Sequence, residues 1–190
     1  MEPRIPPLRA TLLAALVATA FAAWPVAAQP TLSRIPDPCS LLTRADAAEL
    51  MGEAVEPGRS YPTTPWNCVY RARGSDGLLT LTVELGRETD PASTRSGVEL
   101  AACGAEVKRP VDGLGVRAAL YHTPDGRCGE AWTLWVATGV GFRGRTSSRL
   151  TRESEGVVHL TVVRYPPGDP EEVEPVLREA AERVLARLGG

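Results

Sequence analysis

The sequence lacks the short cysteine spacings that metal and redox sites use. The chain has four cysteines, Cys39, Cys68, Cys103 and Cys128, and no two of them form a Cys-x-x-Cys pair. Zinc sites and thioredoxin-like sites are recognised by Cys-x-x-Cys pairs. We therefore assign no metal-binding residue.

Catalytic signatures are equally scarce. Only two histidines, His122 and His159, occur in the chain, and no Gly-x-Ser-x-Gly motif marks a nucleophile. Each histidine lies in a predicted strand, where we expect an ordinary surface or edge position. No catalytic residue is assigned.

An excess of basic residues is also missing. The chain has 21 lysines and arginines against 23 acidic residues, a formal net charge of −2, and Lys108 is its single lysine. Nucleic-acid-binding proteins usually have a strong basic excess, because neutralising phosphates supplies most of their affinity. Binding to nucleic acid is therefore not expected.

The apolar run near the start is too short to cross a membrane. It covers residues 10–23, which is 14 residues, whereas a spanning helix needs about 20. Arg4 and Arg9 precede it, and it closes on Val26-Ala27-Ala28, a small-residue pattern typical of signal peptidase sites. We predict a signal peptide over residues 1–28.

Cleavage there would leave a mature chain, residues 29–190, as one secreted or periplasmic domain of 162 residues. An uncleaved anchor is the alternative. A lipid anchor is disfavoured, because Cys39 follows Pro36-Asp37-Pro38 rather than small residues. Outside the cytoplasm, disulfides form and cytosolic cofactors are scarce. We therefore expect two disulfides, with three possible pairings, and no cofactor.

Helices are predicted in three places. The first covers residues 41–52, where Thr43 and Asp46 can form a capping box. A second is predicted over residues 90–103, with aspartate as cap and proline at the first helical position. The third covers residues 175–188, where apolar residues recur every three or four positions.

Alternation of apolar and polar residues, with turn signals between the segments, predicts five strands. They are residues 66–71, 78–85, 116–123, 131–138 and 157–165. The segments 55–65 and 139–156 are rich in glycine with proline or arginine and are predicted as loops. The order α-β-β-α-β-β-β-α predicts an α+β fold with helices packed on a mostly antiparallel five-stranded sheet.

Three motifs of this chain resemble those of a known group of proteins. The first is Asp37-Pro38-Cys39-Ser40-Leu41-Leu42-Thr43, followed by residues 45–52. It is similar to the opening of secreted and lipoprotein-type domains of uncharacterised function, which are abundant in actinobacteria and related to extracellular sensor domains. Trp66-Asn67-Cys68-Val69-Tyr70 and Val111-Asp112-Gly113-Leu114-Gly115 resemble two further motifs of that group.

Membership of that group would imply an α+β sandwich and no known catalytic residues. It would also imply a disulfide between Cys39 and Cys68, which leaves Cys103 to pair with Cys128. The chain departs from many members because it has no cysteine placed for lipidation.

A glycine-rich motif follows the fourth predicted strand. Residues 139–144 read Gly-Val-Gly-Phe-Arg-Gly, which has the spacing of a dinucleotide-binding loop. That loop must open a helix that presents its amides to a pyrophosphate. The arginine- and serine-rich residues 145–149 show little helical periodicity, so we interpret the glycines as part of a hairpin and assign no cofactor-binding residue.

Two features are candidates for binding a partner. Arg143, Arg145 and Arg149 crowd one predicted loop, which could bind an anionic envelope polymer, a lipid headgroup or an acidic protein surface. Alternatively, they only keep a long hairpin soluble. Trp132 and Trp135 are three apart and therefore point to opposite faces of a strand. Because Trp132 shares its face with apolar neighbours, we expect Trp135 to be an exposed contact residue.

Together these patterns favour an exported envelope protein that binds a ligand or partner and is not an enzyme. The partner would be an envelope protein, a lipid or an anionic polymer, and the mature domain is not expected to span the membrane. One alternative is an extracytoplasmic hydrolase that combines His122 or His159 with Asp125. Another is a structural accessory module of an envelope complex.

Overall fold

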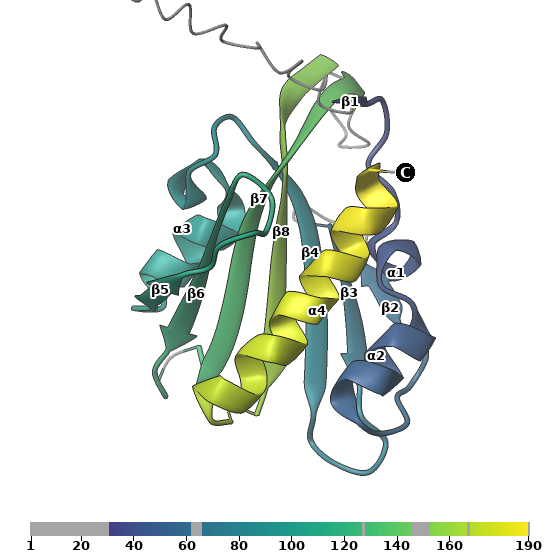
Figure 1. The fold of residues 1–190 in the computed structure, drawn as a ribbon, viewed down its shortest axis with the longest axis vertical. Helices are drawn as coiled ribbons and strands as arrows, with labels where there is room; N and C mark the ends of the chain where they lie inside the picture. The colour runs from purple at the N-terminus through teal and green to yellow at the C-terminus, as the bar shows by residue number, and fades with distance from the viewer. Residues whose placement is uncertain (1–30, 62–65, 127, 146–152, 167, 190) are drawn as a thin grey trace, which may run out of the picture.

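A computed structural model describes residues 31–61, 66–126, 128–145, 153–166 and 168–189. These residues form one mostly antiparallel eight-stranded sheet with helices packed against it, which confirms the α+β class (Figure 1). The expected signal peptide, residues 1–28, lies outside the described residues. No helix within the described part is long and apolar enough to cross a membrane.

The sheet has the strand order β2-β3-β4-β8-β7-β6-β5, and β1 pairs in parallel with the far end of β7. The strands are β1 (Thr31–Leu32), β2 (Arg59–Tyr61), β3 (Trp66–Arg71), β4 (Leu78–Gly86), β5 (Glu106–Pro110), β6 (Arg117–Thr123), β7 (Ala131–Arg145) and β8 (Glu153–Tyr165). The helices are α1 (Pro38–Leu41), α2 (Arg44–Met51), α3 (Arg95–Ala102) and α4 (Pro170–Gly189), with a 3-10 turn η1 (Pro91–Ser93).

The prediction of five strands and of their simple order is wrong. The five predicted strands are β3, β4, β6, β7 and β8, whereas β1, β2 and β5 were not predicted. All five residues of β5 are exposed, and β1 and β2 have only two and three residues. Such short or exposed strands are held by backbone pairing with a neighbour, so they carry no alternation of buried and exposed side chains.

The segment predicted as a glycine- and arginine-rich loop is largely strand. β7 continues to Arg145 and β8 begins at Glu153, so the two strands form a long hairpin arm beyond the rest of the sheet (Figure 1). The register shifts between Ala137 and Gly141, where Gly139 has a positive φ of 80°. Only a glycine adopts this backbone readily, so the pattern that suggested a loop marks a β-bulge instead.

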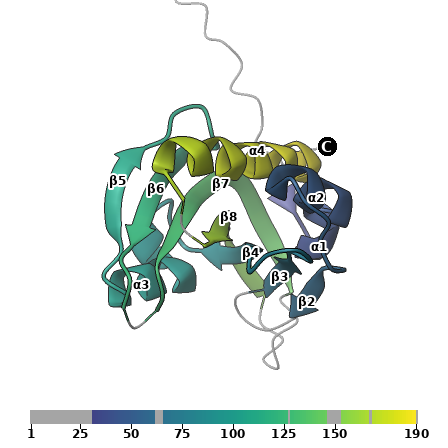
Figure 2. The same cartoon turned by 90° about the horizontal axis from the view of Figure 1, so that it is seen from below.

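One face of the sheet, which we call the α4 face, carries the main core. Its central row runs through Leu81, Val162, Leu134 and Leu120, which are successive cross-strand partners on four strands. α4 lies across this row and buries six side chains against it (Figure 2). These are Val173, Leu177, Ala180, Ala181, Val184 and Leu188.

α4 begins five residues earlier than predicted. Asp169 accepts a hydrogen bond from the amide of Glu171, which caps the helix before Pro170. Pro175, predicted as the start, therefore lies inside the helix. Its missing amide leaves only the carbonyl of the exposed Glu171 without its usual helical partner, so water can satisfy that group.

The amino-terminal helices lie beside α4 on the same face. Asp37 caps α1, with Pro38 at its first position, and a capping box of Thr43 and Asp46 opens α2 as predicted. Gly52 ends α2 in the left-handed conformation with a φ of 68°. The two helices flank the β3 end of the sheet (Figure 1).

The opposite face of the sheet, which we call the α3 face, is covered in part by η1 and α3 (Figure 2). Sequence analysis predicted one helix over residues 90–103. The structure has two elements instead, because Thr94 is extended and caps α3 with its own side chain. The α3 face therefore has a smaller cover than the α4 face.

Two disulfides connect these layers. Cys39 of α1 pairs with Cys68 of β3, and Cys103 at the end of α3 pairs with Cys128 before β7. This is the pairing that the family resemblance implied. The described residues contain no free cysteine.

Candidate functional site

The arginine-rich hairpin is less basic than its sequence suggested. Arg143 is exposed on β7, and the strand register places it opposite Glu155, with Arg145 opposite Glu153. Opposite charges on facing strands offset each other's field. Arg149 lies outside the described residues. The strand register therefore pairs each of the two described arginine positions with an acidic position.

Trp135 does not have the predicted exposed position. Its side chain is fully buried, with 0% of its surface accessible, on the α3 face of β7. Leu100 of α3 and the adjoining Ala105 pack on a small cluster that Trp135 forms with Tyr121. The expectation was wrong because the prediction treated this sheet face as open to solvent, and α3 covers it.

The two histidines lie on opposite faces of the sheet. His122 is half-buried on β6, where its Nε2 lies 3.0 Å from Oε1 of Glu130 and its ring contacts Trp132 of the α4 face. His159 is wholly buried on the α3 face of β8, which corrects the expected surface or edge position. Asp125 is exposed in the β6–β7 connection. The histidines therefore do not meet in one pocket.

His159 has an unusual environment for a buried titratable group. Its cross-strand partners are Glu84 and Ala137, and its ring centroid lies 5.1 Å from that of Trp135. Neither ring nitrogen has a hydrogen-bonding partner of good geometry. Burial lowers the pKa of His159 to about 4, and the nearby backbone of Glu88 opposes this only partly. The imidazole is therefore neutral at physiological pH.

His159 is one of four residues on this face with buried side-chain polar atoms that have no well-aligned hydrogen-bonding partner. The atoms concerned are Asn67 Oδ1, Trp135 Nε1, both ring nitrogens of His159, and Thr161 Oγ1. Asn67, Thr161 and Trp135 belong to one cross-strand row, and His159 lies two residues from Thr161. Unsatisfied buried polar atoms are rare in folded proteins and costly, so this cluster is the strongest candidate for a ligand site among the described residues.

Glu84 is a second buried polar group on the α3 face, and it is fully engaged. Its carboxylate accepts hydrogen bonds from the backbone amides of Arg95 and Ser96, at 3.0 and 3.2 Å, at the amino terminus of α3. Burial raises the pKa of Glu84, and these hydrogen bonds oppose the rise. The carboxylate therefore fixes the start of α3 to the centre of the sheet.

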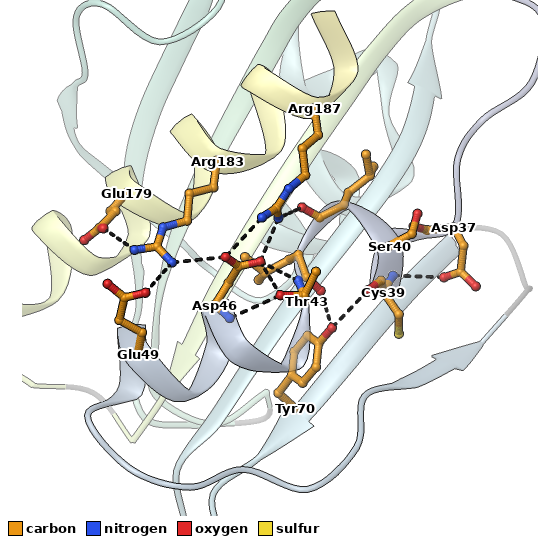
Figure 3. Close-up of polar contacts among 12 residues, drawn as sticks. Asp37, Cys39, Ser40, Thr43, Asp46, Glu49, Tyr70, Glu179, Arg183 and Arg187 are labelled. Carbon is orange, nitrogen blue, oxygen red and sulfur yellow. Dashed lines mark hydrogen bonds and ion pairs between the residues drawn. The ribbon is translucent and has the colours of Figure 1, made fainter. Parts of the chain in front are cut away.

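A polar cluster on the other side of the molecule has a structural role (Figure 3). Asp46 accepts hydrogen bonds from Arg187 and Arg183 of α4, at 2.7 and 3.1 Å, as well as from Thr43. The Arg187 guanidinium holds the pKa of Asp46 well below its usual range, with help from Thr43 and Arg183. Every polar atom of Asp46 has a protein partner, so this cluster joins α2 to α4 rather than binding a ligand.

The phenol of Tyr70 extends the same cluster toward the disulfide. It donates a hydrogen bond to the carbonyl of Leu42, and the carbonyl of Cys39 lies 3.4 Å away (Figure 3). Burial raises the pKa of Tyr70 to about 12, so the phenol keeps its proton and acts as a donor. α1, α2 and β3 are thereby fixed to one another.

The described residues show neither a cluster of metal-ligating side chains nor the helix start of a dinucleotide site. No three histidine, cysteine, aspartate or glutamate side chains within them are grouped to hold an ion. Gly139–Gly144 lies inside β7, where Gly141 and Phe142 pair with β1 and β8. No helix begins there, so the strand does not present the amides that a pyrophosphate needs.

A surface hollow of about 650 Å³ lies beside β2, at the other edge of the sheet. Its lining is Glu56, Pro57, Gly58, Arg59, Ala72 and Arg73. Glu56 and Arg59 are 4.0 Å apart and both substantially exposed. The hollow is open and holds no buried polar group without a partner, so it is a weaker candidate than the α3 face.

Comparisons with known proteins give no relative for this chain. No family model, no curated protein and no solved structure matches it. The function must therefore be inferred from the residues and their geometry.

From the α3-face cluster, the sequence analysis named only two residues. Trp135 was named as an expected exposed contact residue, and His159 as one of the two histidines. Asn67 and Thr161 were not singled out, because a single polar residue in an alternating strand normally faces water. A signal was nevertheless present. Thr80, Thr82 and Glu84 on β4 and His159 and Thr161 on β8 occupy alternate positions, so two adjacent central strands both have a polar face.

The pKa of His159 leads to a prediction about pH. A histidine whose pKa is 6.5 unfolded and about 4 folded contributes full stability above pH 6.5 and loses it as the pH falls to 4. The loss is on the order of 3 kcal/mol. We expect His159→Leu to flatten the stability profile between these pH values in urea unfolding, without a loss at pH 7.

The matched control is His122→Leu, which removes a half-buried histidine from the other face. Its profile should keep the loss between pH 6.5 and 4 that His159 causes. Glu84, whose pKa is raised, gains stability as it takes up a proton and so acts in the opposite direction. A variant lacking His159 that keeps the wild-type slope would show that another group titrates there.

Proposed function

We propose that this protein is an exported, non-enzymatic binding domain whose ligand site is the α3 face of the sheet. Two disulfides support a location in an oxidising compartment outside the cytoplasm. The resemblance of its opening motif to secreted domains of uncharacterised function is consistent with this location. The hydrolase alternative gains no support, since His122 and His159 lie on opposite faces of the sheet.

The observation that carries the proposal is the group of unpartnered polar atoms on one face. Asn67 Oδ1 is an acceptor, Trp135 Nε1 is a donor, and the Thr161 hydroxyl and the neutral His159 ring are both. None of these groups carries a charge at neutral pH. An anionic ligand would be buried here without a counter-charge, at a high cost, and the one carboxylate beside these groups, Glu84, is already bonded to the amides of α3.

The chemistry of the face therefore fits an uncharged molecule with several hydroxyl or amide groups. A sugar or polyol supplies both the donors and the acceptors that these side chains can pair with. The arginine-rich hairpin is the second candidate surface, but its arginines face acidic residues in the strand register. We therefore place the binding site on the sheet and not on the hairpin.

Indole NMR signals provide the test. The mature chain contains three tryptophans, and Trp66 Nε1 donates to Ser60 while Trp132 Nε1 donates to the carbonyl of Gly168. We expect millimolar sucrose, maltose or myo-inositol to shift the Trp135 indole signal and to leave the other two unchanged.

Two threonine variants sharpen this experiment. Thr161→Val removes an unpartnered hydroxyl without changing shape and should weaken binding of the probe by roughly tenfold. Thr133→Val changes a buried threonine one row away on the same face and should bind like the wild type. Equal weakening by both variants, or a response only to anionic probes, would contradict the proposal.

Export itself is testable on the native protein. We expect material from the extracytoplasmic fraction to begin at Gln29 and to show no thiol that alkylates before reduction. Intact-mass measurement with and without reductant distinguishes the outcomes. Precursor-length chains with four reactive thiols would contradict export.

A further inference from the structure

The segment between β4 and β5, residues 87–105, lies over the most deeply buried part of the candidate site. We call it the cover segment; it contains η1 and α3 (Figures 1 and 2). Leu100 packs on the cluster that Trp135 forms with Tyr121 and Ala137. A Cβ built on Gly86 would lie 2.5 Å from His159 Nε2 and 2.6 Å from Ser93 Oγ, so η1 adjoins the histidine ring.

η1 and α3 form one unit. A Cβ on Gly97 would lie 1.9 Å from the carbonyl oxygen of Pro91, so the two elements touch through their backbones. Thr94, between them, caps α3 and also donates to the Pro91 carbonyl. Any movement of α3 therefore carries η1 with it.

The cover segment makes little apolar contact with the sheet. Within α3 only Ser96 and Gly97 are fully buried, Leu100 is half-buried, and Val98 is 54% exposed. α4, by contrast, buries six side chains along β7 and β8. Buried apolar area is the main source of docking free energy, so α3 is held much more weakly than α4.

Two specific ties compensate for this weak apolar contact. At the amino end of α3, Glu84 binds the amides of Arg95 and Ser96. At the carboxyl end, Cys103 is joined to Cys128 beside β7. An exposed ion pair between Arg117 and Asp90, at 3.3 Å, adds little.

We propose that the cover segment is a lid, closed in this structure, whose opening gives a ligand access to Trp135, His159 and Thr161. The closed state leaves polar atoms of Trp135 and Thr161 without partners and the His159 ring without a well-aligned one, and opening allows water or a ligand to pair with them. Closing the lid therefore costs free energy, because these polar atoms lose their partners. The hydrogen bonds of Glu84 and the disulfide at Cys103 offset that cost. This inference rests on the α3 face being the binding site.

Solvent exchange of the tryptophan indole protons measures the opening directly. Trp135 Nε1–H has no acceptor, so burial alone protects it, whereas Trp132 Nε1–H is bonded to Gly168. We expect Cys103→Ser with Cys128→Ser to speed exchange at Trp135 by at least about tenfold and to leave Trp132 unchanged. Glu84→Gln, which weakens the other tie, should act in the same direction.

A fold control accompanies both variants. Amide exchange at Leu177 and Val184, buried in α4, reports on global unfolding. It should stay at its wild-type value, while the amide of Val98 in α3, which bonds to Thr94, exchanges faster. If α4 also loses protection, Leu100→Ala replaces the disulfide variant, since it weakens only the lid contact.

The outcomes separate the lid from the ligand. Unchanged Trp135 exchange in the disulfide, Glu84 and Leu100 variants would overturn the lid, whatever binds. Faster exchange with tighter sucrose or maltose binding in the opened variants supports both proposals. Faster exchange with no response to any probe supports the lid and overturns the assigned ligand class.

Discussion

Asp46→Ala is expected to destabilise the protein by about 2–3 kcal/mol at neutral pH, one of the two largest effects that we predict for substitutions at that pH. Asp46 is 8% exposed and accepts hydrogen bonds from two arginines of α4. The substitution removes charge-assisted hydrogen bonds and the capping box of α2 together. Urea unfolding should show a lower midpoint with an unchanged slope.

Glu49→Gln is the matched control. Glu49 also pairs with Arg183, at 2.9 Å, but its side chain is 69% exposed, so solvent screens the pair. Its unfolding midpoint should remain close to that of the wild type. A similar midpoint for Asp46→Ala and Glu49→Gln would show that the cluster does not join the helices.

The stabilisation from Asp46 should also depend on pH in a defined way. Because its pKa is lowered in the folded protein, its contribution is complete above the ordinary value of 3.8 and is lost as the pH falls below it. The contribution of His159 is lost in a higher window, between pH 6.5 and 4. The two effects can therefore be separated in one acid titration.

Removing the Cys39–Cys68 disulfide is expected to have the other large effect. The bond closes a loop of 29 residues, which is worth about 3.5 kcal/mol in the chain-entropy model. Cys68 is fully buried in the main core, so Cys39→Ser with Cys68→Ser also places a hydroxyl there. We expect a loss of at least about 3.5 kcal/mol in chemical denaturation.

The second disulfide provides the comparison. Cys103 and Cys128 close a loop of similar length, 25 residues, so the entropic term is nearly the same. Cys128 is exposed, however, and the bond holds α3 rather than the main core. Its removal should lower global stability less and should loosen α3 first. A larger global loss here than for Cys39–Cys68 would contradict these separate roles.

The disulfides therefore divide the molecule functionally as well as structurally. One fixes α1 to β3 beside the rigid layer that α4 forms with the sheet. The other fixes a weakly packed helix over a sheet face rich in polar side chains. A binding domain needs both a rigid scaffold and a part that gives access to the ligand.

Much of the scaffold was predictable from local patterns in the sequence. The capping box of Thr43 and Asp46, the hairpin of β3 and β4, and the apolar stripe of α4 all follow from residues within a few positions of one another. Their physical causes are equally local: satisfied helix amides and one buried face per element.

The candidate site was not predictable, because burial depends on what packs on an element from elsewhere in the chain. Trp135 was expected at the surface, yet α3, more than thirty residues earlier, covers it. Asp46 was recognised as a cap, but its pairing with Arg187, 141 residues away, was not. Neither contact leaves a periodic signal in the sequence.

The sequence by itself determined which segments are strands and helices with a buried face, and that four cysteines are available to brace the chain. The tertiary structure alone decided where the edge strands pair and on which face of the sheet polar groups are buried. Periodicity records only that a residue alternates with its neighbours. Which layer covers each face is decided by long-range packing, and that packing buries His159 and leaves polar atoms of Trp135 and Thr161 without partners.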